Sequence, residues 1–402
     1  MATTPVPPPN KKVALMPAES ELVAFDHSAA GHQGISSNAS GSLIIKPCTQ
    51  AEIDFYESAK VHPLFQAHMP TFIGSLFQQD EEQDAPDSKT PVPAAVNGTT
   101  TAMPSPSLTK RMSWKPSGGK KLSTGLAIVL ENVAAGFKHP NVLDVKLGAR
   151  LWADDAPRSK RQKLDEVAKR TTTGSLGFRV AGMKIRHEEQ TGTETGPSST
   201  TPPRVEDPAH VEVKNGYKSY TKFYGQSFDQ HTVVDAFTTY LGGVHHDTQS
   251  GKKRLRRTRA PEIARRLIRE LESIQYVLEH EESRMYSASV LMVYEGDEDA
   301  IEAAIQEEQK HEQGGDDLDL DVENNGNNIV DVVVGDDDDN DIGIDIDIDI
   351  DDDDDDDEVP PKVHDVRLID FAHASWTPGQ GPDDNALMGV RNILRILRDL
   401  VE

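Results

Sequence analysis

The sequence has 402 residues, of which 36% are hydrophobic and 5% aromatic, and its formal net charge is -26. No apolar run approaches the ~18 to 20 residues that a membrane-spanning helix needs, and the N-terminus lacks the apolar core of a secretory signal, so we expect an intracellular protein with no transmembrane segment. The single cysteine, Cys48, excludes an internal disulfide and a multi-cysteine metal site. We expect it to be an inert thiol.

Most of the negative charge comes from one segment. Residues 316–358 contain 22 acidic residues and no Lys or Arg, which leaves 46 acidic and 42 basic residues elsewhere. The remainder of the chain is therefore close to neutral. A basic pocket for an anionic ligand is compatible with this composition.

Polar, low-complexity stretches divide the chain, and they contain too few apolar residues to offset the entropy of ordering. We predict a disordered N-terminus and three flexible insertions, at residues 1–20, 79–120, 187–212 and 311–362. The segments between them combine strand and helix patterns. They predict an α+β fold with two lobes, an N-terminal lobe over residues 21–133 and a C-terminal lobe over residues 134–402.

Short apolar runs predict strands, and three- and four-residue apolar spacing predicts helices. In chain order we expect a strand at 41–47, a helix at 51–59, strands at 123–133 and 141–149, a basic helix at 157–170, a strand at 174–185, a long helix at 261–282, strands at 287–295 and 366–374, and a helix at 385–402. The long helix has the clearest pattern, with Ile263, Leu267 and Leu271 on one face. Asp383 or Asp384 is expected to cap the last helix.

Two residues have the positions that phosphoryl transfer from ATP requires. Lys46 ends an apolar strand and precedes a predicted helix that carries Glu52, so the lysine can face phosphates while the carboxylate orients it. Asp370 directly follows another apolar strand, where a kinase places the acid that binds magnesium. A solvated lysine and an aspartate that begins a turn are the alternatives for each residue taken alone.

The segment PNVLDVKLG contains Pro140, Asp144, Lys146 and Gly148 in a P-x-x-x-D-x-K-x-G pattern. Alternate residues of a strand point to the same side, so Asp144 and Lys146 share one face. A surface ion pair is the alternative to a binding site.

Together with SLGFRVAGMKI, YSASVLMVYEG and LIDFAHA in the same order, this segment resembles the inositol polyphosphate kinase family, and most closely its fungal multikinase group. P-x-x-x-D-x-K-x-G is the signature of that family. The family's Ser-Ser-Leu-Leu motif is replaced here by residues 288–291, Ala-Ser-Val-Leu, which leaves Ser289 as the remaining hydroxyl.

The resemblance implies an ATP- and Mg²⁺-dependent kinase with a distantly protein-kinase-like fold. In that scheme Lys46 contacts the ATP phosphates, and the backbones of Glu131 and Val133 contact adenine. Asp144 contacts the ribose or the substrate, and Asp370 and Ser289 hold the metal. Lys146 contacts the inositol phosphate or the transferring phosphoryl group, and His373 lies near the inositol hydroxyl. A solvent-facing structural histidine is the alternative for His373.

The basic helix is the expected acceptor site. Lys160, Lys163 and Lys169 would bind a polyanionic ring, since lysine and arginine clusters are the usual phosphate receptors. A merely solvated basic helix is the alternative. The sequence lacks the H-R-D and G-x-G-x-x-G motifs of protein kinases, which disfavours a protein substrate.

We therefore predict phosphorylation of inositol 1,4,5-trisphosphate to the tetrakis- and pentakisphosphate, with phosphoinositide head groups as further possible acceptors. An inositol hexakisphosphate kinase and a non-catalytic nuclear acidic scaffold are the alternatives. The acidic tract suggests contact with transcription factors or chromatin, and the basic run at 251–262 is either a nuclear import signal or an exposed helix start. We expect a monomer in nucleus and cytoplasm that does not bind nucleic acid directly.

Overall fold

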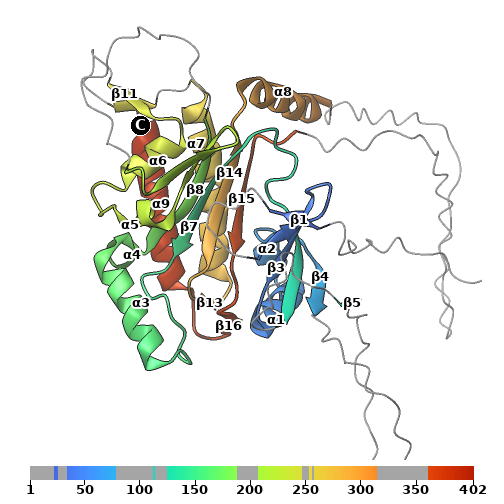
Figure 1. Ribbon diagram of the computed structural model, residues 1–402, viewed down its shortest axis with the longest axis vertical. Helices are drawn as coiled ribbons and strands as arrows, with labels where there is room; N and C mark the ends of the chain where they lie inside the picture. The colour runs from blue at the N-terminus through green and yellow to red at the C-terminus, as the bar shows by residue number, and fades with distance from the viewer. Residues whose placement is uncertain are drawn as a thin grey trace, which may run out of the picture.

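The computed structural model describes residues 22–25, 34–77, 112–113, 125–187, 207–246, 253–255, 258–314 and 361–402. These residues form two lobes, each built around a six-stranded sheet (Figure 1). The predicted disordered N-terminus and most of the three predicted insertions, including the acidic tract, lie outside the described residues. No helix among the described residues is both long and apolar enough to cross a bilayer.

The N-terminal lobe contains a sheet with strand order β1-β2-β3-β6-β4-β5 and two short helices. Its elements are β1 (Val23–Ala24), β2 (Ser36–Ser37), β3 (Leu43–Pro47), α1 (Gln50–Ser58), the 3-10 helix η2 (Ala59–Val61), α2 (Pro63–Gln66), β4 (Phe72–Phe77), β5 (Met112–Ser113) and β6 (Leu126–Glu131). Thr49 caps α1 by accepting a hydrogen bond from the Glu52 backbone N–H.

The C-terminal lobe contains a sheet with strand order β15-β14-β7-β8-β10-β9, in which each strand is antiparallel to its neighbours. Its strands are β7 (Pro140–Leu147), β8 (Phe178–Arg186), β9 (Val211–Lys214), β10 (Tyr217–Tyr220), β14 (Ser289–Glu295) and β15 (His364–Ile369). Two short strand pairs lie outside this sheet: β11 (Val244–His246) pairs with β12 (Lys253–Leu255), and β13 (Ser283–Met285) pairs with β16 (Ala374–Trp376). Its helices are α3 (Arg158–Arg170), α4 (Thr172–Leu176), α5 (Lys222–Gln226), α6 (Val234–Tyr240), α7 (Ala260–His280), α8 (Glu298–Gly314) and α9 (Asp384–Val401).

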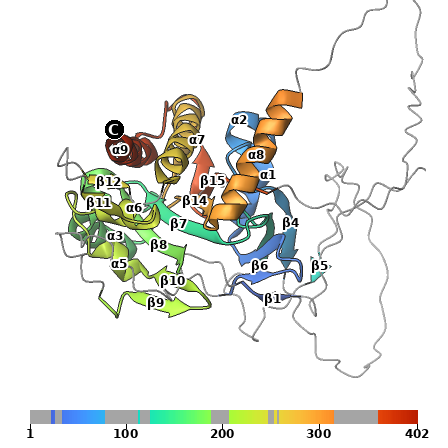
Figure 2. The ribbon, with the colours of Figure 1, turned by 90° about the horizontal axis from the view of Figure 1, so that it is seen from above.

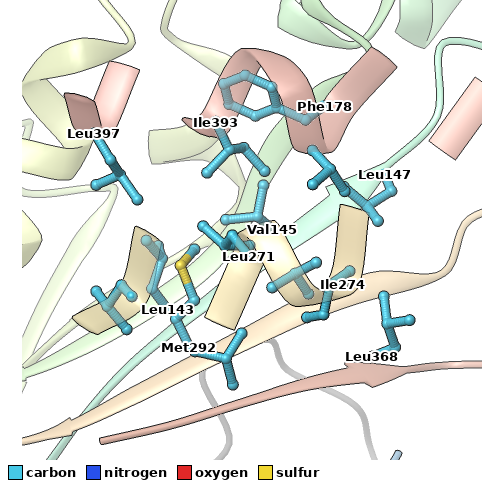
Figure 3. Close-up of a cluster of buried hydrophobic side chains, with 14 of the residues drawn as sticks. Leu143, Val145, Leu147, Phe178, Leu271, Ile274, Met292, Leu368, Ile393 and Leu397 are labelled. Carbon is cyan, nitrogen blue, oxygen red and sulfur yellow. The ribbon is translucent and has the colours of Figure 1, made fainter. Parts of the chain in front are cut away.

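The two long helices α7 and α9 pack side by side over one face of this sheet (Figure 2). Alternation along β7 sends Leu143, Val145 and Leu147 into the core beneath them, where they meet Leu271 and Ile393 (Figure 3). The predicted apolar face of α7 is buried, and Asp383 caps α9 by accepting from the Ala386 backbone N–H. Asp144 and Lys146 lie between these residues along β7 and therefore point to the other face of the sheet.

Aromatic side chains join the two lobes. Phe55 of α1 stacks on Phe371 and on Trp376, with ring centroids 4.9 and 4.7 Å apart. The Trp376 indole N–H also donates to Ser58 Oγ at 2.9 Å, and the Leu368 backbone N–H donates to the His68 carbonyl at 2.7 Å. These contacts attach α1 directly to the chain segment that carries Asp370, so the two lobes position one site together.

Candidate active site

A cavity of about 320 Å³ lies between the lobes. The N-terminal lobe lines it with Lys46, Pro47, Cys48, Thr49 and Glu52, and the C-terminal lobe lines it with Lys146, Tyr286, Ser287, Asp370, Ala372 and His373. Four of the residues predicted from the sequence, Lys46, Lys146, Asp370 and His373, therefore face one space although they come from segments far apart in the chain.

Lys46 is the centre of an ion network in this cavity. Its ammonium group donates to Glu52 Oε1 at 2.8 Å and to Asp370 Oδ1 at 2.5 Å. Burial opposes the charge on Lys46, but the carboxylates of Asp370 and Glu52 outweigh it and hold the pKa of Lys46 above its ordinary value. The lysine therefore stays charged at neutral pH, as a group that holds phosphates must.

Asp370 lies between lysines from both lobes. Its other oxygen, Oδ2, is 3.6 Å from Lys146 Nζ. Asp370 directly follows the last residue of β15 and adopts a left-handed backbone conformation, with φ 69°. Aspartate tolerates this conformation better than most residues, and such outliers concentrate at functional sites.

Lys146 is held by the backbone as well as by charge. Its ammonium group donates to the Ser287 carbonyl oxygen at 2.6 Å. Gly148, the last residue of the P-x-x-x-D-x-K-x-G pattern, has φ +93°, and a Cβ placed there would lie 2.4 Å from Asn385 Nδ2. A side chain at this position would collide with Asn385, so the structure explains why the segment ends in glycine.

Asp144 shares the face of β7 with Lys146 but does not line this cavity. It is 3% exposed, and its register partners are Leu291 on β14 and Gly182 on β8. Arg179 of β8 pairs with Lys146 and belongs to the same face. Burial lowers the pKa of Arg179, and the negative charge of Asp144 partly compensates. Sequence reasoning missed Arg179, although it stands within the quoted SLGFRVAGMKI segment.

The basic helix α3 meets the cavity at His373. Lys160 Nζ lies 3.2 Å from His373 Nε2. Burial lowers the pKa of His373, and the nearby charge of Lys160 lowers it further. The imidazole is therefore neutral at pH 7, and an ammonium donor on Nε2 implies that Nδ1 carries the ring proton.

The three predicted lysines of α3 are not brought together. Lys163 is exposed and lies one turn from Lys160. Lys169 is nine residues beyond Lys160, which corresponds to two and a half helical turns, so it lies on the opposite side of α3. Only Lys160 contacts a residue of the cavity through a described hydrogen bond.

The chain between the lobes follows β6. Glu131 ends that strand, and its carboxylate accepts a hydrogen bond from Thr71. Val133 is buried against Val142 and Val293. Asn132 fixes this connection, because its side chain donates to the Gly41 carbonyl at 2.7 Å and accepts from the Ala134 N–H at 3.0 Å. The predicted adenine contacts of residues 131 and 133 stay a prediction.

Ser289 fits the predicted metal role in one respect. It pairs with Lys146 on β7 and with Ile369 on β15, so it lies beside the strand that ends at Asp370. Its hydroxyl is buried and has no hydrogen-bond partner among the described residues. No cluster of three or more His, Cys, Asp or Glu side chains suited to a metal occurs in the described part of the chain. Magnesium needs few protein ligands when phosphates supply the rest.

Cys48 lines the cavity beside these charges. Burial and the neighbouring Glu52 carboxylate raise the pKa of Cys48 to about 12. The thiol therefore stays protonated at neutral pH, which agrees with its expected inertness.

Comparison with known proteins decides the family. The family model described as inositol polyphosphate kinase matches residues 127–398, more than half of the chain. The chain belongs to the inositol polyphosphate kinase family. Inositol polyphosphate multikinase of Saccharomyces cerevisiae is 31% identical over 385 residues, covering 92% of this chain and 96% of that protein. Inositol hexakisphosphate kinase 3 of Mus musculus is 27% identical over 283 residues, covering 68% of this chain but 51% of that protein.

A solved structure from the same family supports the fold. The crystal structure of an inositol phosphate multikinase from Saccharomyces cerevisiae, in complex with ADP and Mn²⁺, matches with a TM-score of 0.53 and 25% identity. The match covers 90% of this chain and 100% of that one. Membership of the kinase family and the two-lobed α+β fold, both predicted from the sequence, are confirmed.

Proposed function

We propose that this chain is an ATP- and Mg²⁺-dependent multikinase that phosphorylates inositol 1,4,5-trisphosphate stepwise to the tetrakis- and pentakisphosphate. The observation that carries the proposal is the position of Asp370, between Lys46 of one lobe and Lys146 of the other, in a cavity that His373 also lines. Lys160 of α3 contacts this His373. Near-full-length similarity to a yeast multikinase supports the same choice.

The charges divide the cavity into a nucleotide part and an acceptor part. Lys46, oriented by Glu52, is placed to hold phosphates of ATP, and Asp370 with Ser289 would hold the magnesium ion. When bound, that ion would neutralise the negative charge that develops on the transferring phosphoryl group. The relative in the solved structure binds ADP and Mn²⁺.

The acceptor part contains a neutral base beside a cation. His373 Nε2 accepts a hydrogen bond from Lys160 and is 3.2 Å from its ammonium group. Burial and Lys160 lower its pKa, so the ring is neutral at pH 7, and Nε2 could take the proton of an inositol hydroxyl once the bound substrate has drawn the Lys160 ammonium group away from it. Lys160 and Lys146 would bind phosphates of the ring, and Arg179 adds a further cation on the sheet face.

The test is transfer of the ATP γ-phosphate to inositol 1,4,5-trisphosphate, with products separated by charge. We expect tetrakis- and then pentakisphosphate from the wild type, and no product from Asp144→Ala or Asp370→Ala. A pyrophosphate from inositol hexakisphosphate, with no product from the trisphosphate, would assign the chain to the hexakisphosphate kinases. No phosphate transfer to either acceptor would favour the non-catalytic scaffold.

A nuclear role is a separate proposal that rests on composition. The acidic segment 316–358 has the charge to contact basic transcription factors or chromatin, and it lies outside the described residues. Fractionation of cells that express the tagged chain, with and without this segment, would test the predicted presence in nucleus and cytoplasm. An unchanged nuclear fraction and unchanged protein contacts after its removal would argue against the role.

A further inference from the structure

The turn between β13 and β14 contacts three separate parts of the site. The Tyr286 backbone N–H donates to the His373 carbonyl at 3.2 Å. The Ser287 carbonyl accepts from Lys146 Nζ at 2.6 Å, and the Ser287 hydroxyl donates to the Leu151 carbonyl at 3.0 Å. The carbonyl of Ser287 therefore binds a lysine of the cavity, and its hydroxyl binds the segment that follows β7.

The backbone of Ser287 has an unusual conformation. Its φ is 64°, a left-handed value that few residues other than glycine adopt. Asp370 has φ 69°, and it too contacts Lys146. Two such residues in contact with one ammonium group indicate that the surrounding structure enforces both conformations. In Ser287 the conformation aims the carbonyl at Lys146.

The residues that the Ser287 hydroxyl holds lead to α3. Residues 148–157 connect β7 to this helix, and the helix itself has no buried residue. Asn385 holds the same connection, because it accepts from the Arg150 N–H at 2.8 Å and donates to the Arg150 carbonyl at 2.9 Å. The position of Lys160 on α3 therefore depends on how this connection is fixed.

We propose that Ser287 is a positioning residue that anchors, relative to Lys146, the connection that leads to the acceptor helix α3. Its carbonyl orients the lysine, and its hydroxyl fixes the connection that carries the helix. The inference rests on the proposed function, because it assigns α3 to the acceptor. It predicts that loss of the hydroxyl weakens acceptor binding and spares the nucleotide.

The first experiment is steady-state kinetics of Ser287→Ala in the full chain, with inositol 1,4,5-trisphosphate and ATP varied separately. The variant keeps the carbonyl but loses one hydroxyl hydrogen bond, which corresponds to roughly a fivefold change. We expect the acceptor KM to rise roughly fivefold, with kcat and the KM for ATP each within about twofold of wild type. Ser227→Ala removes a similar hydroxyl-to-carbonyl bond, to Tyr224, in another part of the lobe and is expected to change neither KM.

A second variant separates the hydroxyl from the backbone conformation. Ser287→Gly also lacks the hydroxyl but adopts positive φ without strain. We expect it to raise the acceptor KM as much as Ser287→Ala does. Wild-type kinetics in Ser287→Ala, equal changes in both KM values, or a normal acceptor KM in Ser287→Gly would each overturn the proposal. A wild-type chain that transfers phosphate to no inositol phosphate would instead overturn the proposed function together with this inference.

Discussion

The two sides of the cavity, which we propose bind the nucleotide and the acceptor, are held in different ways. On the nucleotide side, α1 buries Glu52, Ile53, Phe55 and Tyr56. Phe55 stacks on Phe371 and Trp376, and Tyr56 meets the Phe371 ring edge-on. On the acceptor side, α3 buries none of its 13 residues. It is attached through single contacts, such as the Trp152 indole N–H to Asp165 at 2.6 Å and the Arg161 guanidinium over the Trp152 ring.

We infer from this difference that the charges proposed for phosphate transfer are assembled before any substrate binds. Lys46 is already paired with Glu52 and Asp370 in the free protein, and packing between the lobes restricts movement of α1. Weakly packed elements open at lower free energy than core elements, so α3 is the part free to adjust to its ligand. Substitutions should therefore affect turnover on one side and acceptor affinity on the other.

The largest effect is expected for Asp370→Asn. The amide keeps the shape but removes the charge that pairs with Lys46 and that would hold the metal. We expect kcat to fall at least about 100-fold, measured by phosphate transfer at saturating substrates. Asp399→Asn, an exposed carboxylate on α9, is the control and should keep wild-type turnover. Substantial activity in Asp370→Asn would contradict the role assigned to this residue.

The next effect is expected for Gly148→Ala, compared with Gly216→Ala. Both glycines have positive φ, but only at Gly148 would the new Cβ meet other atoms, with Asn385 Nδ2 2.4 Å away. Denaturant unfolding should show a loss of roughly 2 to 4 kcal/mol for Gly148→Ala and about 1 kcal/mol for Gly216→Ala. Equal losses would mean that backbone strain alone, and not the contact with Asn385, requires this glycine.

A smaller effect should separate the two sides of α3. Lys160→Ala removes the ammonium group next to His373 and is expected to raise the acceptor KM about tenfold, with the KM for ATP nearly unchanged. Lys169→Ala alters the opposite side of the helix and should change either KM less than about twofold. If Lys169→Ala has the larger effect, the acceptor lies elsewhere on α3.

The smallest effect concerns the protonation of His373. Burial and Lys160 lower its pKa below 6.5, so the neutral ring predominates at pH 7, and activity should decline only as the pH falls through that lowered pKa. NMR titration would measure this value. Lys160→Gln removes the charge of Lys160 from this environment, so the pKa should rise and the acid limb of the activity profile should move to higher pH. A wild-type pKa at or above 6.5 would contradict this account.

Periodic apolar patterns allowed the long elements to be predicted. The residues expected on the buried face of α7 are buried, and the expected strands appear as β3, β6, β7, β8, β14 and β15. Residues 174–176 of the strand expected at 174–185 belong instead to α4. The hairpin of β9 and β10 was missed although a signal existed. Asn215 and Gly216 both have positive φ and join the two strands, and Asn-Gly is the dipeptide that favours such turns.

The site was only partly predictable for a physical reason. A strand-end lysine with a helix carboxylate is a local pattern, so the pairing of Lys46 with Glu52 could be foreseen. The contacts of Ser287 and Asn385 could not be foreseen, because they depend on backbone atoms of Leu151 and Arg150 that only folding brings near them. The nine-residue spacing already places Lys160 and Lys169 on opposite sides of α3, but only the structure shows that the Lys160 side faces His373.

Hydrogen exchange with and without inositol 1,4,5-trisphosphate would test the central contrast most directly. We predict that backbone amides of α1, residues 50–58, exchange slowly in the free protein, that those of α3, residues 158–170, exchange faster, and that the acceptor slows exchange in α3 but not in α1. Equal protection of both helices in the free protein, or slowing confined to α1, would contradict a preassembled nucleotide side with an adjustable acceptor helix.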